Sequence, residues 1–354
     1  MPDLLVTGGA GFIGANFVRY WRRQHPGDRV TVLDSLTYAA SPASIADLED
    51  VDLIVGDICD TSLVTRLLGE RDVQILVHFA AESHVDRSIT GPDAFVTTNI
   101  VGTHSLLKAA KAAWLDQGKP HRFHHVSTDE VYGSLEAEDP PFSESTRYAP
   151  NSPYSASKAA SDHLVRAYHH TFGLNVTTSN CSNNYGPYQF PEKLIPLFML
   201  NCLHGIPLPV YGDGMNRRDW LHVDDHCLGI ELAILRGRAG EVYNIGGGQE
   251  LPNVTVIQEI CGTVDAAFAA DPSLASRFPA ALPALGRRSI ELLAFVADRK
   301  GHDRRYAIDE TKCRSELGYS PRHNFSDGLA ATLSWYLANE RWWLPLMNRP
   351  VSEL

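Results

Sequence analysis

Tyr154 and Lys158 are four residues apart, and this pair is the first feature of the sequence that could carry out chemistry. Residues at this spacing lie on one face of a helix, and Pro153 is well suited to open that helix. Lys158 could hold a cofactor ribose while its charge favours the phenolate form of Tyr154. The phenolate would then act as a base for a substrate hydroxyl during hydride transfer. Taken alone the pair is weak evidence, because the same spacing often arises by chance.

Two adjacent carboxylates, Asp129 and Glu130, follow Thr128 where an expected strand ends. Neighbouring side chains of a regular strand face opposite ways, so both carboxylates can serve one site only if the backbone turns after Thr128. Such a pair suits elimination of water: a protonated acid gives its proton to the leaving hydroxyl, and an ionised partner takes a proton from carbon. Like charges at close range help to separate their pKa values. A solvated acidic turn is the alternative interpretation, and the position just upstream of Tyr154 favours the catalytic one.

A glycine-rich turn with Gly8, Gly11 and Gly14 directly follows the first expected strand and opens a helix. Such a turn lets the backbone approach a pyrophosphate, and the helix N-terminus stabilises that anion. Asp34 ends the second strand twenty residues after Gly14, where a carboxylate would bind a ribose 2′-hydroxyl and repel a 2′-phosphate. The combination predicts NAD rather than NADP. Asp57 after the third strand could cover the adenine, with a helix N-cap as the alternative role.

Short β-branched runs alternate with helical patterns through the first half of the chain. Strands are expected over residues 4–7, 30–33, 53–55, 75–79, 123–127 and 176–180. This rhythm predicts an α/β fold with a Rossmann-type doubly wound parallel sheet, followed by a smaller, mostly α C-terminal substrate-binding lobe. We expect an NAD-binding domain over residues 1–186, with strands at about 215–250 able to return to the sheet, and a substrate-binding domain mainly over 187–354. The Ala- and Pro-rich stretch 263–290 reads as a short helix and a surface insertion.

The composition limits the classes of partner. The 354 residues carry 31 Lys plus Arg against 42 Asp plus Glu, a formal net charge of -11, which gives no support for binding nucleic-acid polymers or anionic membranes. The six cysteines are scattered, which is typical of reduced thiols in a cytoplasmic protein, and we see no export signal. The histidine pairs at 124–125 and 169–170 lack metal-ligand spacing, so we expect no metal.

Eight motifs together are more specific. They cover residues 7–14, 79–88, 127–133, 154–158, 180–188, 191–196, 218–224 and 301–306. They closely resemble the dTDP-glucose 4,6-dehydratase family, an extended branch of the short-chain dehydrogenase/reductase superfamily, and the resemblance spans roughly residues 3–340.

The resemblance implies a reaction without net redox change. Tyr154, supported by Lys158 and Thr128, would take the proton of the glucose C4 hydroxyl as a hydride passes to NAD. The resulting ketone acidifies the C5 proton, which Glu130 would remove while Asp129 protonates the leaving C6 hydroxyl. The hydride then returns to C6 and gives dTDP-4-keto-6-deoxyglucose.

The resemblance also implies binding residues. Those expected at NAD are Gly8, Gly11, Phe12, Ile13, Gly14, Asp34, Ser35, Leu36, Thr37, Asp57, Ile58, Phe79, Ala80, Ala81, Ser83, Thr98, Tyr154, Lys158 and Asn184. Those expected at dTDP-glucose are Ser83, Thr128, Asn183, Lys193, Leu194, Pro209, Val210, Tyr211, Arg218, Asn253, His302 and Tyr306. Lys193 and Arg218 suit a pyrophosphate or nucleotide, whereas Arg304 and Arg305 are each expected to be surface charges. A homodimer is expected through the Tyr154 helix and the helix that begins near Asn99.

Three alternatives stay open at this point. The substrate could be another sugar nucleotide, such as a UDP-linked one. A protein of the same fold could be an epimerase or decarboxylase, but such relatives need no acid and base pair after the Thr, so Asp129 and Glu130 argue against them. A non-catalytic dinucleotide-sensing protein should lack Tyr154 and Lys158, and both are present.

Overall fold

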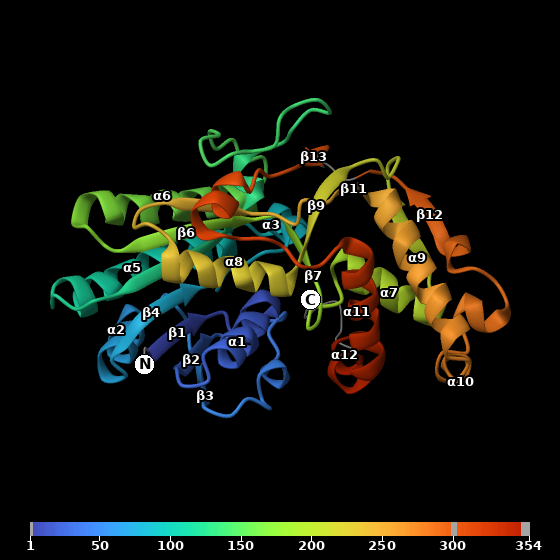
Figure 1. Cartoon of the computed structure of the whole chain (residues 1–354), viewed down its shortest axis with the longest axis horizontal. Helices are drawn as coiled ribbons and strands as arrows, with labels where there is room; N and C mark the ends of the chain where they lie inside the picture. The colour runs from blue at the N-terminus through green and yellow to red at the C-terminus, as the bar shows by residue number, and fades with distance from the viewer. Residues whose placement is uncertain (1–2, 299–302, 348–354) are drawn as a thin grey trace.

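A seven-stranded sheet is the largest element of the structure, a computed structural model that describes residues 3–298 and 303–347 (Figure 1). Its strands are β1 (Asp3–Thr7), β2 (Arg29–Asp34), β3 (Val51–Val55), β4 (Val73–His78), β5 (Arg122–Thr128), β6 (Val176–Cys181) and β10 (Val242–Ile245). They lie in the order β10-β6-β5-β4-β1-β2-β3, and every neighbouring pair is parallel. The strand order reverses at β1, which creates a crevice at the carboxyl edge where such sheets bind ligands. The predicted Rossmann-type sheet is confirmed.

Helices cover both faces of this sheet. α1 (Phe12–Gln24) and α8 (Val223–Arg236) cover one face; α2 (Thr61–Glu70), α5 (Thr103–Ala110) and α6 (Pro153–Phe172) cover the other. Short helices α3 (Val85–Thr90) and α4 (Asp93–Phe95) and two π-helical segments, η2 (Val96–Gly102) and η3 (Lys111–Leu115), complete the second layer. Phe17 and Trp21 on α1 and Leu106 and Leu107 on α5 are fully buried. Burying side chains of this size stabilises the fold by about 1.5–3 kcal/mol each, so both helical layers are anchored to the sheet.

A smaller lobe with its own core lies beside the carboxyl edge of the large sheet (Figure 1). Its helices are α7 (Leu194–His204), α9 (Asn253–Ala270), α10 (Leu274–Arg277), α11 (Phe325–Ala338) and α12 (Glu340–Met347). Its small sheets consist of β11 (Glu250–Pro252), β9 (Arg217–His222), β13 (Arg305–Tyr306) and β7 (Asn183–Tyr185), and of β8 (Leu208–Tyr211) with β12 (Leu293–Val296). The predicted mostly α lobe is confirmed.

The expectation for residues 263–290 is wrong in part. The helix there is long, because α9 runs to Ala270 and buries Val264 and Phe268 in the lobe core. Beyond it, Leu274 and Ala281 are also buried, so this stretch is not a surface insertion. Two 3-10 turns, η5 (Leu282–Leu285) and η6 (Ser289–Leu292), lead into β12. The helical spacing of the few large apolar side chains is hard to recognise in the sequence, because alanines lie between them.

The stretch around residues 215–250 contributes to both parts. β10 adds an edge strand to the large sheet, next to β6, whereas β9 belongs to a small sheet. Where the chain divides into domains stays a prediction. Among the helices of residues 3–298 and 303–347, none is long and apolar enough to cross a membrane.

Candidate active site

A single cavity of about 700 Å³ follows the carboxyl edge of the large sheet and continues under the small lobe. Its wall contains the described residues that the sequence predicts for catalysis and binding, with one exception: Leu36 is not part of the lining. His302 lies outside the described residues. The structure therefore brings together, around one cavity, residues that are up to about 300 positions apart in the sequence, such as Gly8 and Tyr306.

The glycine-rich turn between β1 and α1 is shaped for close backbone approach. Gly8 has a φ of +71°, and a Cβ there would lie 2.6 Å from the Ala80 backbone nitrogen. A Cβ on Gly14 would lie 2.2 Å from the Gly8 carbonyl oxygen. α1 begins after Gly11 without a side-chain cap and without an acidic residue in its first turn. The N-terminus of α1 is thus available to a pyrophosphate, as NAD binding requires.

Asp34 lies beside this glycine-rich turn and is held in place by two backbone N–H groups. Its carboxylate accepts hydrogen bonds from the N–H of Ala10 at 2.9 Å and of Leu36 at 2.8 Å. Burial raises the pKa of Asp34, and these two hydrogen bonds act in the opposite direction. Leu36 has a φ of 52° and contributes its backbone to this turn rather than its side chain to the cavity wall. Asp57 also lines the cavity, and the N-cap of α2 is Asp60 instead.

Tyr154 and Lys158 enter the cavity from the first two turns of α6. Ser152 caps this helix through a capping box, and Pro153 occupies its first turn. The residues just before Tyr154 therefore fix where the helix begins and where Tyr154 lies on it. Both side chains are buried, at 9% and 5% exposure. Lys158 donates a hydrogen bond from Nζ to the Val126 carbonyl at 2.8 Å. Burial and then the charge of Glu130 raise the pKa of Tyr154, while a hydrogen bond with Thr128 lowers it.

The backbone does turn after Thr128, as a shared site for the two carboxylates requires. β5 ends there, and a 3-10 turn, η4 (Asp129–Tyr132), follows directly. The Thr128 side chain caps this turn by accepting from the Glu130 N–H at 3.3 Å. Gly133, with a φ of 101°, ends it where a Cβ would lie 2.6 Å from the Ala149 carbonyl oxygen. Asp129 and Glu130 both line the cavity.

Asp129 has the environment of a protonated acid. It is 2% exposed, and its pKa is raised well above the usual value by burial first and then by the nearby charges of Glu130 and Asp219; Arg218 opposes them. Its Oδ2 atom has no hydrogen-bond partner among residues 3–298 and 303–347. A buried carboxyl oxygen without a partner is costly unless it carries a proton or meets a ligand. Both conditions suit a general acid.

The small lobe supplies cationic and aromatic groups to the far end of the cavity. Arg218 on β9 is buried, donates to the Asp303 carbonyl at 2.8 Å and lies over the Tyr306 ring at 4.3 Å. Lys193, just before α7, contacts the Ser83 carbonyl at 3.4 Å. Of the two arginines expected at the surface, Arg304 is exposed. The expectation for Arg305 is wrong, because it is buried and pairs with Glu250 through Nε and Nη2.

Sequence inspection missed Asn99, a buried side chain in η2. Its amide nitrogen donates to the Ser157 hydroxyl at 2.8 Å and to the Glu82 carbonyl at 3.0 Å, and its oxygen accepts from the Glu82 N–H at 2.9 Å. Asn99 therefore ties the loop after β4 to the helix that carries Tyr154 and Lys158. No local pattern marks this residue, because the π-helical register that aims it inward is not visible in the sequence.

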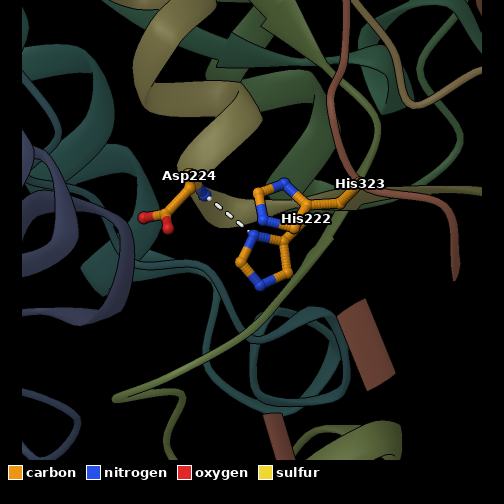
Figure 2. A group of neighbouring side chains, drawn as sticks. All are labelled: His222, Asp224 and His323. Atoms are coloured by element: carbon orange, nitrogen blue, oxygen red, sulfur yellow. Dashed lines mark hydrogen bonds between the residues drawn. The ribbon is translucent and has the colours of Figure 1, made fainter. Parts of the chain in front are cut away.

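His222, Asp224 and His323 lie close together (Figure 2), and none of the three lines the cavity. The two imidazole rings stack with centroids 4.1 Å apart and an interplanar angle of 24°. Lone pairs of imidazole lie in the ring plane, so stacked rings do not aim at a common ion. His222 accepts from the Asp224 backbone N–H at 3.3 Å, and the Asp224 carboxylate lies 3.7 Å from Arg23. These contacts account for the close approach of the three side chains, and we assign no metal to them.

Comparisons with known proteins agree with this geometry. The family model described as GDP-mannose 4,6 dehydratase matches residues 5–332. The dTDP-glucose 4,6-dehydratase of Xanthomonas campestris pv. campestris (strain B100) is 53% identical over 349 residues, covering 97% of this chain and 95% of the relative. dTDP-glucose 4,6-dehydratase 1 of Escherichia coli (strain K12) is 49% identical over 354 residues, covering 96% and 94%.

Solved structures give the same picture. DesIV, a dTDP-glucose 4,6-dehydratase from Streptomyces venezuelae with NAD and TYD bound, has a TM-score of 0.85 at 49% identity, covering 97% of this chain and 99% of that one. UDP-glucose 4-epimerase from Thermotoga maritima with UDP-glucose has a TM-score of 0.81 at 25% identity, covering 96% and 99%. Epimerases thus share the fold at much lower identity.

Proposed function

This chain belongs to the dTDP-glucose 4,6-dehydratase family, and we propose on that premise that its cavity converts dTDP-glucose to dTDP-4-keto-6-deoxyglucose and water. It is an NAD-dependent hydro-lyase. The observation that carries the proposal is the position of Asp129. This carboxyl group is buried beside Glu130, and its Oδ2 atom has no hydrogen-bond partner among the described residues. It lines the same cavity as Tyr154 and the glycine-rich turn expected to bind NAD. An epimerase has no use for this acid and base pair.

Tyr154 is the base for the C4 hydroxyl. Thr128 contacts the phenol and acts against the increase in its pKa, and Lys158 follows Tyr154 by one turn on the same helix. The Tyr154 oxygen takes the proton of the C4 hydroxyl, and C4 becomes a ketone when it also loses its hydride. NAD, when bound, supplies the hydride acceptor for C4 and the hydride donor for C6.

Glu130 and Asp129 carry out the elimination. The C4 ketone acidifies the C5 proton, so a carboxylate becomes a strong enough base to remove it. Glu130 takes that proton and breaks the C5–H bond, while Asp129 gives its proton to the C6 oxygen, which leaves as water. Glu130 then returns a proton to C5, and the cycle closes when Tyr154 loses its proton and Asp129 regains one. The raised pKa of Asp129 suits its half of this exchange.

The two anionic ligands are held by different parts of the wall. Gly8, Gly11 and the N-terminus of α1 would hold the NAD pyrophosphate, and Asp34 a ribose hydroxyl. Lys193 and Arg218 would hold the sugar nucleotide, which needs local cations because the chain as a whole is acidic.

We further infer a cytoplasmic homodimer. All six cysteines are free thiols, five of them buried, which suits a reducing compartment. η2 and α6, from the predicted interface, expose Val96, Val101 and Phe172 by 45–50%. Apolar side chains on adjacent helices are typical of helical interfaces. Sedimentation of the protein as a monomer at micromolar concentration would contradict the dimer.

The function is tested with purified protein, dTDP-glucose and, in parallel, UDP-glucose. Mass spectrometry should show loss of one water from dTDP-glucose without consumption of NAD, and a much slower reaction with UDP-glucose. An epimer of unchanged mass would refute the dehydratase function, and equal rates would refute the preference for dTDP.

A further inference from the structure

Asp162 lies on α6 one helical turn beyond Lys158 and two turns beyond Tyr154. It is 6% exposed and does not line the cavity. Its carboxylate accepts hydrogen bonds from the Ser127 hydroxyl and the Tyr148 hydroxyl, both at 2.9 Å, and its other oxygen lies 3.0 Å from His125 Nε2. The carboxylate is therefore held through both oxygens, outside the wall of the cavity.

Lys158 and Asp162 together hold three consecutive residues of β5. Lys158 binds the Val126 carbonyl, and Asp162 binds the side chains of His125 and Ser127 on either side of it. Alternate residues of a strand share one face, which explains how one carboxylate reaches both side chains. The two contacts set the position of α6 on the strand that ends in Thr128.

The two charges also depend on each other. Burial lowers the pKa of Lys158, and the largest opposing influence is the charge of Asp162. Burial likewise raises the pKa of Asp162 to about 6, and Lys158 is the largest influence against that increase. A buried ammonium group without a counter-charge tends to lose its proton.

The other titratable groups around the pair do not replace this counter-charge. They are His78 on β4, His125 on β5, Cys181 on β6, Tyr132 on η4, Tyr148 before α6, and Tyr154 and His163 on α6. Burial keeps His78 and His125 neutral by lowering their pKa values, and it raises those of Cys181, Tyr132 and Tyr148. Asp162 thus holds the negative charge that stabilises Lys158 from the protein side.

We propose that Asp162 is a positioning residue whose carboxylate keeps Lys158 charged and in place, so that Lys158 can hold the cofactor and support Tyr154. This inference rests on the proposed function only in assigning Lys158 its role as a cation. Asp162 acts through Lys158 and not on the substrate.

The test measures NAD affinity as a function of pH for the wild type, Asp162→Asn and Asp162→Glu. Asn is matched in shape: its carbonyl can accept from Ser127 and Tyr148, and its amide can donate to His125 Nε2 if the imidazole proton moves to Nδ1, which has no partner among the described residues. Asp116→Asn is the control, since Asp116 pairs with Lys111 on the surface.

Removing the carboxylate lowers the pKa of Lys158, so Lys158 should lose its proton at lower pH. We expect the alkaline loss of NAD affinity to begin about one pH unit lower in Asp162→Asn, equivalent to about tenfold weaker binding within that window. Asp162→Glu should restore most of it, and Asp116→Asn should follow the wild type. The rate of NADH formation from dTDP-glucose should show the same pH displacement, with KM changed less than kcat.

Two results would overturn the proposal. One is an Asp162→Asn profile that coincides with the wild type in NAD affinity; the other is a loss that is equal at every pH and is not restored by Glu, which would indicate packing alone. NAD binding needs no sugar nucleotide. A protein with the expected binding profile that releases no water from dTDP-glucose would therefore refute the proposed function and leave the role of Asp162 standing.

Discussion

Thr128 Oγ1 accepts a hydrogen bond from the Glu130 backbone N–H at 3.3 Å, at the point where β5 ends. This bond caps the 3-10 turn that presents Asp129 and Glu130 to the cavity. The same side chain contacts the Tyr154 phenol and acts against the increase in its pKa. Thr128 therefore links the residues proposed for oxidation with those proposed for elimination.

Replacing both carboxylates should separate oxidation from elimination. The double substitution Asp129→Asn and Glu130→Gln keeps shape but removes the acid and the base. We expect NADH to form and persist, seen by its absorbance, while product formation falls at least about a hundredfold. Glu138→Gln, at an exposed position in the following loop, is the control and should behave as wild type. Full turnover by the double variant would show that these carboxylates take no part.

Tyr154→Phe should block the first step without disturbing the site. The Tyr154 ring packs edge-on against Phe95 with centroids 6.3 Å apart, and phenylalanine keeps that contact. Loss of the base should slow NADH formation by about 10²- to 10⁴-fold. NAD affinity, measured by calorimetry, should change only a few-fold. NADH formation at the wild-type rate would exclude Tyr154 as the base.

Gly14→Ala should damage the dinucleotide cradle. The added methyl group would lie 2.2 Å from the Gly8 carbonyl oxygen, so the turn must move. We expect NAD affinity to fall at least about tenfold and the free energy of unfolding to fall by about 1–3 kcal/mol. Gly69→Ala is the matched control: it lies in α2 with no atom near the added methyl group, and should stabilise the protein by up to about 1 kcal/mol. Equal NAD affinity for both variants would contradict the assignment.

Asp162 should also affect how the free energy of unfolding depends on pH. Folding raises its pKa from 3.8 to about 6, so between these values the folded protein holds a proton that the unfolded chain has released. The contribution of this group to the free energy of unfolding therefore falls as pH rises through this window, by up to about 3 kcal/mol. In urea unfolding, the free energy of unfolding of the wild type minus that of Asp162→Asn should therefore fall from about pH 4 to about pH 6. Parallel curves would contradict the raised pKa.

Local signals explain why much of the site could be predicted from the sequence. The glycine turn, Asp34 at a strand end and the Tyr154–Lys158 spacing all depend on residues close in the chain. The turn after Thr128 could be stated only as a condition, since the capping hydrogen bond depends on side-chain orientation.

Other features depend on tertiary packing. Arg304 and Arg305 are neighbours in sequence, yet Arg304 is exposed and Arg305 is buried, because the Arg305 guanidinium binds Glu250 and two backbone carbonyls of the loop after β5. Asn99 acquires its role from a π-helical register. Asp162 follows Tyr154 and Lys158 at helical spacing, but its partners on β5 become visible only in the folded structure.

The most direct test of the central claim, that Glu130 and Asp129 eliminate water across C5 and C6 of the sugar, is the reaction of dTDP-glucose in deuterated water. Glu130 exchanges its proton with solvent before returning it, so mass spectrometry and NMR of the product should find one deuterium at C5, loss of one water and no net change in NAD. A product that has lost one water from dTDP-glucose but carries no deuterium at C5 would contradict the account. A product with the mass of dTDP-glucose and inverted configuration at C4 would also contradict it.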